Sequence, residues 1–546
     1  MGNVLSDVIS RAKIIRAAIK QLLELSKSYD DLQKRIDISP GLPVKNPTKS
    51  FWMDVPSPVA SHRPAIFPGY ADVVIIGSGI TGTSIARTLV TQSPLNVVML
   101  EARETCSGAT GRNGGHIKPP VQHDYQVLKK KYGIKQAQII TRFRRAHVKE
   151  MLRVADEDGI LKASQARAVD TLDVYYEEEM FEEAKKAVAD WKADMPNDSL
   201  DYAVYEKEEA IEKFHLSPQV VGVVYNMAGA IHAYQFVTGI LEKLLQTHGD
   251  QFYLSTQTPC VKILEPTSVN PYYTVITTRG AISTPHVVHA TNAWTSHLLE
   301  PMRTKIVATR ATMTAQRPGT SLSPSSLDGH RSWVFYDKHI GYDYLTQLPS
   351  GEHELMFGGG FFQGGREGAL NEIGNANDAE YFTGVATHLA GALPILFGER
   401  NWGAEMHPNP ESLNPSTEWF EGRVKAVWSG LMGISADTLP WVGRIPPKLA
   451  GRAQPPPTSA PSPQPKLETK KAQHMVKSSA PPGEWMAGGY SGEGMGLAFL
   501  SGEALAYMVM GAEREAKLAE WFPEVLKVTE KRWRKAKVED LLDELE

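Results

Sequence analysis

The chain has 546 residues and a formal net charge of −4, from 58 Lys and Arg against 62 Asp and Glu. This length has room for two or three domains and a large core, which excludes a small disulfide-stapled fold. The near balance of charge gives no sign of a nucleic-acid partner, and the absence of an apolar run of about 18 residues argues against a transmembrane helix.

The N-terminal region predicts a helix followed by an extended arm. Residues 5–27 place apolar side chains at helical spacing with basic residues between them. The first six residues also fit M-G-x-x-x-[ST], so Gly2 is a candidate for myristoylation and residues 2–27 for a peripheral membrane contact. We favour the alternative, a helix docked on the folded body, because short motifs often match by chance. The Pro-containing stretch Ser39–Trp52 predicts the arm.

The next segment, Ala71–Val90, predicts a buried strand, a glycine turn and a helix start. Four apolar residues, Val73 to Ile76, form a continuous run typical of a parallel strand that is covered on both faces. Gly77, Gly79 and Gly82 then give the G-x-G-x-x-G spacing, which serves a tight turn, close approach of a pyrophosphate and packing of the helix on the strand. The helix N-terminus would hold the phosphates.

A second apolar strand, Val97 to Leu100, ends at Glu101. A carboxylate about 20 residues beyond the last motif glycine is the expected partner of ribose hydroxyls. The two features together favour a bound dinucleotide over a purely structural strand–helix–strand unit.

Charged helices and short strands alternate from Asp124 to Met227, and strand-rich pieces return between Met302 and about Trp402. The stretch from Arg452 to Gly483 is rich in proline and has no aromatic residue, which predicts a disordered insertion. The last part, from Glu513 to Glu546, alternates apolar and charged residues and predicts a C-terminal helix.

Five segments in order carry a family resemblance. They are the glycine turn with the loop ARETCSGATGRNGGHIKPP after Glu101, the segment that starts at His232, the strand and turn from Val287 to Leu298, Trp428–Pro446, and WMAGGYSGEGMGLAFLSGEAL from Trp485 to Leu505. Together they resemble the D-amino-acid oxidase-like, or sarcosine oxidase-like, family of FAD-dependent oxidoreductases. The sequence departs from the family pattern at two of these segments. Ala233 stands where the family has Pro after the His, and there is no cysteine from Trp428 to Gly433, where relatives can attach FAD.

The resemblance implies an α/β fold in which a Rossmann-type FAD-binding domain, like that of glutathione reductase, is interleaved with a substrate domain on a mostly antiparallel sheet. The implied FAD-binding parts are 67–123, 229–300, 425–450 and 484–511, and the implied substrate parts are 124–228 and 301–424. The arm region 1–66, the insertion 451–483 and the C-terminal helix 512–546 complete the chain.

The resemblance also implies where FAD, held noncovalently, would sit. The two glycine-rich loops would bring backbone amides against the pyrophosphate and the flavin, where larger side chains would obstruct them; Arg112 would pair with a phosphate or a flavin carbonyl. The residues expected to bind FAD are Gly77, Gly79, Ile80, Thr81, Gly82, Glu101, Ala102, Arg103, Gly108, Ala109, Thr110, Arg112, Asn113, Gly114, Gly115, Val261, Thr291, Asn292, Trp294, Gly489, Ser491, Gly492, Glu493, Gly494, Met495 and Gly496.

The implied reaction is oxidation of a CH–NH bond of an amine or amino acid, with oxygen or another electron acceptor downstream. His116, which follows the first flavin loop, could contact substrate, tune the flavin or act as a base near neutral pH; a structural histidine is nearly as good an interpretation. Tyr342 and Tyr344 could wall a substrate amine with their π faces. Oxidation of a 2-hydroxy acid and a non-catalytic flavoprotein module remain the alternatives.

Two cysteines, Cys106 and Cys260, are too few for an extracellular disulfide framework, which favours a reducing, cytoplasmic compartment. Cys106 lies beside the first flavin loop and could be redox-active, but a small buried residue is the better interpretation. We expect no metal site.

Overall fold

The computed structural model describes residues 27–322, 327–337, 341–363, 366–406, 419–457 and 479–540. The predicted N-terminal helix, with its possible lipid and membrane contacts, lies almost wholly outside these residues, and so does most of the Pro-rich insertion. Residues 27–37 are helical. Within the described ranges, every helix is too short or too polar to cross a bilayer.

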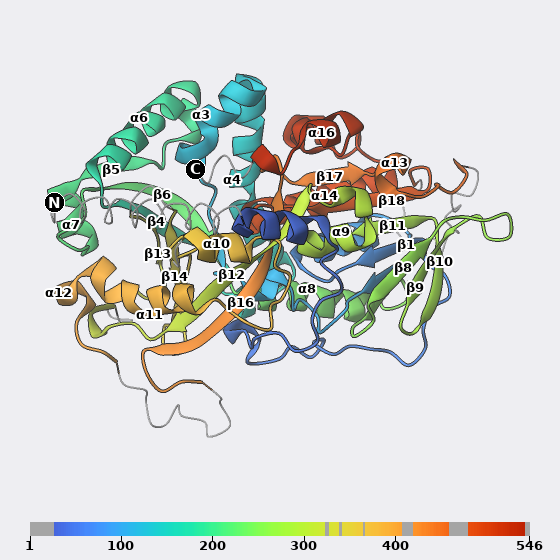
Figure 1. The fold of residues 1–546 in the computed structure, drawn as a ribbon, viewed down its shortest axis with the longest axis horizontal. Coiled ribbons are helices and arrows are strands. Elements are labelled where there is room, and N and C mark those ends of the chain that lie inside the picture. The colour runs from blue at the N-terminus through green and yellow to red at the C-terminus, as the bar shows by residue number, and fades with distance from the viewer. Residues whose placement is uncertain are drawn as a thin grey trace, which may run out of the picture.

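A six-stranded sheet forms one half of the molecule (Figure 1, right). All neighbouring strands run parallel except the edge pair β17 and β18. The two strands predicted first are found at the predicted residues, which confirms the Rossmann-type FAD-binding half. In spatial order the strands are β17 (Trp441–Arg444), β18 (Gly483–Gly488), β11 (His286–His289), β1 (Val73–Ile76), β2 (Val97–Leu100) and β7 (Phe252–Ser255).

Both faces of this sheet are covered, which explains the continuous apolar run of β1. Val73 and Ile75 belong to the core shared with the helices, whereas Val74 and Ile76 pack with residues of a three-stranded antiparallel sheet. The helices are α2 (Ile80–Gln92), α8 (Ala233–Thr247) and α14 (Gly494–Met510), and the small sheet is β8 (Cys260–Leu264), β9 (Tyr273–Thr277) and β10 (Gly280–Thr284).

A nine-stranded sheet forms the other half (Figure 1, left and centre). Its neighbours are antiparallel except β13 and β4, as expected for the substrate domain. The strands are β16 (Val424–Ser435), β12 (Ile306–Gln316), β15 (Leu355–Gly358), β14 (Asp343–Gln347), β13 (Arg331–Tyr336), β4 (Arg167–Tyr175), β6 (Gly222–Ala230) and β3 (His116–Ile117), with β5 (Ala203–Glu206) paired to β6.

Helices lie on both faces of the nine-stranded sheet. The apolar sides of α7 and α11 join Trp333, Phe335 and Phe357 in one core, while α3 and α6 contribute to the larger core on the opposite face. The helices of this half are α3 (Val121–Tyr132), α6 (Glu178–Asp194), α7 (Lys207–Phe214), α10 (Arg366–Glu372), α11 (Thr383–Phe397) and α12 (Glu399–Trp402). Four others contact elements of the six-stranded half: α4 (Ile134–Glu157) packs on α14, α5 (Leu161–Ser164) on α8, α9 (Thr295–Leu298) on β8, and α13 (Pro447–Ala450) on residues of β17 and β18.

Three elements contact a different half of the molecule from the one predicted for them. β3 and β16 belong to the nine-stranded sheet although both were expected in FAD-binding parts, because β16 pairs along its length with β12. The chain crosses to the six-stranded sheet only after β16, at β17. In turn α4, expected in the substrate domain, packs on α14, where the His147 Nε2 atom accepts a hydrogen bond of 3.2 Å from the Leu500 N–H.

The predicted single C-terminal helix is also wrong for the described residues. Two short helices, α15 (Leu518–Trp521) and α16 (Glu530–Lys535), are separated by a 3₁₀ turn that follows Pro523. Proline removes a backbone donor and disfavours a helical residue before it, so one continuous helix cannot form there.

The packing of α14 on α2 depends on Gly502. A Cβ atom at this position would lie 2.7 Å from the Thr81 carbonyl oxygen and 2.9 Å from the Ser84 Cβ atom. We expect Gly502→Ala to lower the free energy of unfolding by about 1–3 kcal/mol, because the two helices must move apart.

The matched control for this variant is Gly391→Ala in α11. A Cβ atom there has no neighbour within 4 Å, so the better helix propensity of alanine should raise stability by about 0.5–1 kcal/mol. Urea unfolding of both variants measures the difference, and equal effects would contradict the close helix contact.

Candidate functional site

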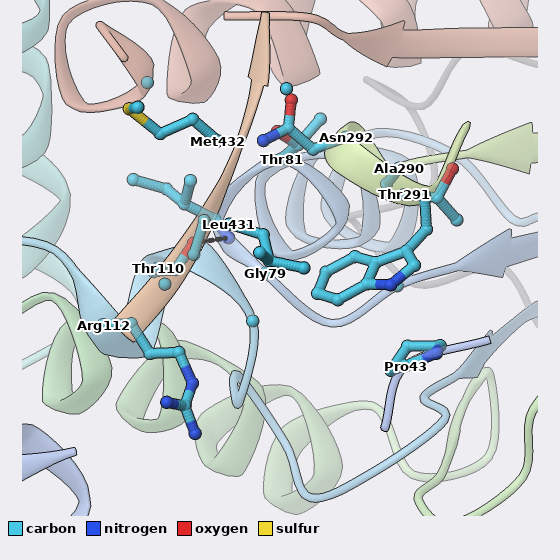
Figure 2. Close-up of a pocket in the computed structure, with 18 of the residues that line it drawn as sticks. Pro43, Gly79, Thr81, Thr110, Arg112, Ala290, Thr291, Asn292, Leu431 and Met432 are labelled. Atoms are coloured by element: carbon cyan, nitrogen blue, oxygen red, sulfur yellow. Dashed lines mark hydrogen bonds between the residues drawn. The ribbon is translucent and has the colours of Figure 1, made fainter. Parts of the chain in front are cut away.

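A long pocket lies at the carboxyl ends of β1, β2 and β11 (Figure 2). This crevice is the usual ligand position in open parallel sheets. Its walls come from the glycine turn, the segments after β2 and β11, the first flavin loop, the middle of β16 and the start of α14. Segments far apart in the chain therefore meet around one space, as the two glycine-rich loops predict.

The glycine turn has the geometry that its spacing indicates. Gly77 has φ +111°, and a Cβ atom there would lie 2.6 Å from the Ala290 carbonyl oxygen. A Cβ atom on Gly82 would lie 2.0 Å from the Gly77 carbonyl oxygen. Gly79 is the N-cap of α2 and carries no side chain to occupy the helix N-terminus, so the turn is shaped for close approach of an anion.

Glu101 is held at the edge of the pocket. One carboxylate oxygen accepts hydrogen bonds from the Ser78 N–H (3.1 Å) and the Ser78 hydroxyl (2.7 Å). The other accepts from the Arg103 N–H at 2.9 Å. The carboxylate thus has a fixed orientation at the end of β2, where a ribose would lie.

The first flavin loop needs small residues for a reason other than the one expected. A Cβ atom on Gly111 would lie 2.3 Å from the Cys106 carbonyl oxygen, one on Gly114 2.7 Å from the Tyr344 ring, and one on Gly115 2.2 Å from the Ile231 carbonyl oxygen. The neighbours that exclude larger side chains are therefore parts of the protein itself.

The Arg112 side chain is bound by other groups of the protein. Its guanidinium donates to the carbonyl oxygens of Ser107 and Ser429, both at 2.9 Å, and lies 3.7 Å from the Asp378 carboxylate. Burial lowers the pKa of Arg112 to about 10, and it stays charged at neutral pH. Its side chain points away from Gly79 (Figure 2). These contacts support a structural role for Arg112 and do not support the expected pairing with a phosphate or a flavin carbonyl.

Arg103 belongs both to the pocket lining and, with Arg112 and Asp378, to a buried charge cluster. It lines the pocket and donates from Nη1 to both oxygens of Asp378 at 3.0 Å. Asp378 is fully buried and stands between Arg103 and Arg112.

The second glycine-rich loop forms the opposite wall. Its backbone is fixed by the Asn292 amide oxygen, which accepts from the Gly489 N–H at 3.0 Å, and by the Gly433 carbonyl, which accepts from the Ser491 N–H at 2.9 Å. The N-cap of α14 is Glu493, whose carboxylate lies 3.0 Å from the Arg144 guanidinium. Arg144 also pairs with Asp124.

The three catalytic candidates have different positions. Tyr344 lines the pocket and packs against Gly114 of the first flavin loop, with its hydroxyl 3.1 Å from the Met313 sulfur. Tyr342 is half exposed, and its ring centroid lies 6.4 Å from that of Tyr344. His116 lies on β3 outside the pocket lining, and its Nε2 atom is buried without a hydrogen-bond partner.

Electrostatics correct the expectation for His116. Burial, followed by the nearby charge of Lys118, lowers the pKa of His116 to about 3. Its imidazole is therefore neutral at physiological pH and cannot act as a base with a pKa near neutrality. Lys118 itself is buried and pairs with Asp173 at 2.9 Å.

Most residues expected to bind FAD line the pocket. Those that do are Gly77, Gly79, Ile80, Thr81, Glu101, Ala102, Arg103, Gly108, Ala109, Thr110, Arg112, Asn113, Thr291, Asn292, Trp294, Gly492, Gly494 and Met495. Those outside the lining are Gly82, Gly114, Gly115, Val261, Gly489, Ser491, Glu493 and Gly496. Val261 is 47% exposed, while its buried neighbour Cys260 lines the pocket; the register of β8 with β9 shifts between Cys260 and Lys262.

Sequence reasoning gave no cofactor-binding role to several lining residues, and two groups of them are notable. Gly430, Leu431, Met432 and Gly433 come from the middle of β16, and Gly41, Leu42 and Pro43 come from the N-terminal arm. The two glycines of β16, three residues apart in the segment where relatives can attach FAD, were a usable signal, since a Cβ atom on Gly433 would lie 2.5 Å from the Asn292 amide oxygen. The arm carries no comparable motif.

The cysteines are unreactive where they stand. Both are free and buried, and burial raises the pKa of the Cys106 and Cys260 thiols. A redox role for Cys106 is not supported, because the thiolate is the reactive form. In the described part of the chain, no three His, Cys, Asp or Glu residues are grouped so as to hold a metal ion.

Comparisons with known proteins agree with this geometry. The model of the family described as "FAD dependent oxidoreductase" matches residues 72–508. Gamma-glutamylputrescine oxidoreductase of Escherichia coli is 24% identical over 309 residues, which are 54% of this chain and 66% of that protein, so the match spans slightly less than two thirds of the relative.

Solved structures show the same fold. Glycine oxidase from Geobacillus kaustophilus has a TM-score of 0.55 at 17% identity, with 83% of this chain and 98% of that chain covered. L-proline dehydrogenase from P. horikoshii has a TM-score of 0.56 at 18% identity, with 84% and 98% covered. The glycine cradle, the fixed Glu101 carboxylate and the lining fit FAD, and the chain belongs to the family of FAD-dependent oxidoreductases related to D-amino-acid oxidase and sarcosine oxidase.

Proposed function

We propose that this protein oxidises a CH–NH bond of an amine or amino acid to an imine, with noncovalently bound FAD accepting the hydride at flavin N5. Similarity to a gamma-glutamylputrescine oxidoreductase and to the fold of glycine oxidase supports this substrate class. The structural observation that supports it is a surplus of carboxylate groups close to Tyr342, the neighbour of Tyr344, which lines the pocket.

The surplus is visible in the ion pairs near the start of α14. Arg144 stands between two carboxylates, Asp124 and Glu493, and Lys118 is already paired with Asp173. Three carboxylates therefore face two cations. Burial raises the pKa of Asp124, and that of Glu493 to about 7, so Glu493 is partly protonated near neutral pH and a cation bound nearby would favour its ionised form.

Such a region favours a cationic substrate over an anionic one. The carboxylates, which ionise more readily beside a cation, would attract an ammonium group, and the π faces of Tyr342 and Tyr344 would stabilise it further. Tyr344, in contact with Gly114 of the flavin loop, also keeps water from that end of the pocket.

His116 takes a different role from that of a base. With a pKa of about 3 its ring stays neutral, and its Nε2 atom is buried without a hydrogen-bond partner beside the first flavin loop. It cannot take a proton from a substrate ammonium, so the reactive amine must lose that proton elsewhere.

Two features of the cellular setting belong to the same proposal. The electron acceptor is oxygen or another oxidant, and the compartment is reducing and cytoplasmic, which both free cysteines support. The alternative substrate, a 2-hydroxy acid, would bring a carboxylate without an ammonium into a region of surplus negative charge.

Anaerobic mixing tests the substrate class. Primary and secondary amines and amino acids should bleach the flavin absorption of the purified protein, whereas matched 2-hydroxy acids should not, because they lack the cation. Bleaching by hydroxy acids alone would contradict the amine proposal, and bleaching by neither class would favour a non-catalytic module.

Acid precipitation tests the mode of FAD attachment. After treatment with trichloroacetic acid, the yellow colour should stay in the supernatant, because a noncovalent cofactor is released when the protein unfolds. A yellow pellet would show a covalent bond, and mass spectrometry of the peptides that contain Cys260, His116 or His297 would then locate it.

The pKa of His116 gives a pH prediction. Between pH 5 and 9 the imidazole stays neutral, so His116→Asn should change the rate of flavin reduction without moving the midpoint of its pH profile. Because the folded-state pKa lies below 6.5, the unfolded chain takes up this proton first, and the contribution to stability is lost as the pH falls from about 6.5 towards 3.

As the pH falls below about 6.5, the melting temperature of His116→Asn should therefore fall less than that of the wild type. Stopped-flow spectroscopy and thermal unfolding at each pH measure the two effects. If the pH profile of flavin reduction has an inflection between pH 6 and 7 in the wild type but not in the variant, His116 titrates normally and the prediction is wrong.

A further inference from the structure

The N-terminal arm, residues 38–66, precedes the part of the chain that matches the family, yet it borders the pocket. The family match begins at residue 72. Gly41, Leu42 and Pro43 nevertheless line the pocket, and Figure 2 shows Pro43 at its margin. The Ser39 hydroxyl lies 2.9 Å from the His297 Nδ1 atom, so the arm is tied to another lining residue at this place.

A second contact joins the arm to the buried charge cluster below the pocket. The Thr48 N–H donates to the Asp378 carbonyl oxygen at 2.8 Å. The Thr48 hydroxyl oxygen accepts from the Arg112 guanidinium at 3.2 Å and from the Ser429 N–H at 3.0 Å. One threonine of the arm thus connects the flavin loop to β16.

A third contact fixes the backbone of the first flavin loop. The Ser50 hydroxyl donates to the Gly111 carbonyl at 2.6 Å, and the Trp52 indole N–H donates to the Asn113 carbonyl. Ser50 and Trp52 are 1% and 2% exposed, so both donors are shielded from water in the docked arm. Without the arm, these two carbonyl groups of the loop would lose their partners in the protein.

We propose that residues 39–52 of the arm are a part of the FAD site that lies outside the family domain. Gly41, Leu42 and Pro43 close one side of the pocket, and Thr48, Ser50 and Trp52 hold the loop that contacts the cofactor. FAD binding and docking of the arm then stabilise each other, because each requires the same loop conformation. The inference concerns cofactor retention and stands whichever substrate the protein oxidises.

The double variant Thr48→Val, Ser50→Ala tests the loop contacts. We expect the dissociation constant of FAD, measured by quenching of flavin fluorescence on addition to the apoprotein, to rise by at least about tenfold, since the hydrogen bonds that hold the loop are lost. Ser61→Ala, an exposed serine of the same arm, is the control and should stay within about twofold of the wild type. An unchanged dissociation constant in the double variant would overturn the proposal.

Limited proteolysis gives an independent readout on the wild-type chain. Lys45 lies in the exposed part of the arm and is a trypsin site. Saturating FAD should slow cleavage at Lys45 by at least about fivefold relative to the apoprotein, because the docked arm cannot enter the protease. Equal cleavage rates with and without FAD would show that arm docking and cofactor binding are independent.

Discussion

The arrangement around the pocket depends on one buried carboxylate. Asp378 is fully buried, accepts from Arg103 at 3.0 Å and stands 3.7 Å from Arg112. Charges removed from water cost several kcal/mol each unless they are paired, so these three groups must stay together. Because both arginines flank the first flavin loop, their common partner determines how that loop lies against the pocket.

The same residue connects three segments that the sequence keeps far apart. The main-chain oxygen of Asp378 accepts from the Thr48 N–H of the arm and from the Ser429 hydroxyl of β16. The flavin loop, the arm and β16 are thereby held at fixed distances. A site that binds a large, extended cofactor needs such a frame, because each segment contacts a different part of the ligand.

Local patterns were sufficient for much of the fold. The apolar runs Val73–Ile76 and Val97–Leu100 are strands at those residues, since burial on both faces leaves a continuous signal. The steric roles of Gly77 and Gly82 were also predictable, because the atoms that crowd them lie within the same unit or beside it. The mostly antiparallel second sheet followed from the family resemblance.

Features that depend on distant partners could not be predicted. Burial gives His116 a pKa of about 3, and its surroundings come from strands that are remote in the sequence. Cys260 and not Val261 lines the pocket, at a point where the register of β8 with β9 shifts. β16 contributes to the pocket but belongs to the nine-stranded sheet, so the boundary predicted before it, at residue 425, differs from the one in the structure. The residues of the arm that line the pocket carry no sequence motif.

The position of β16 also limits how the molecule can move. Gly430 to Gly433 form a wall of the pocket while the same residues pair with β12, with Leu431 opposite Arg310 and Gly433 opposite Ala308. This wall is therefore part of a paired sheet and cannot shift by itself without breaking ladder hydrogen bonds between β16 and β12. Any change in the width of the pocket must come from the other segments that border it.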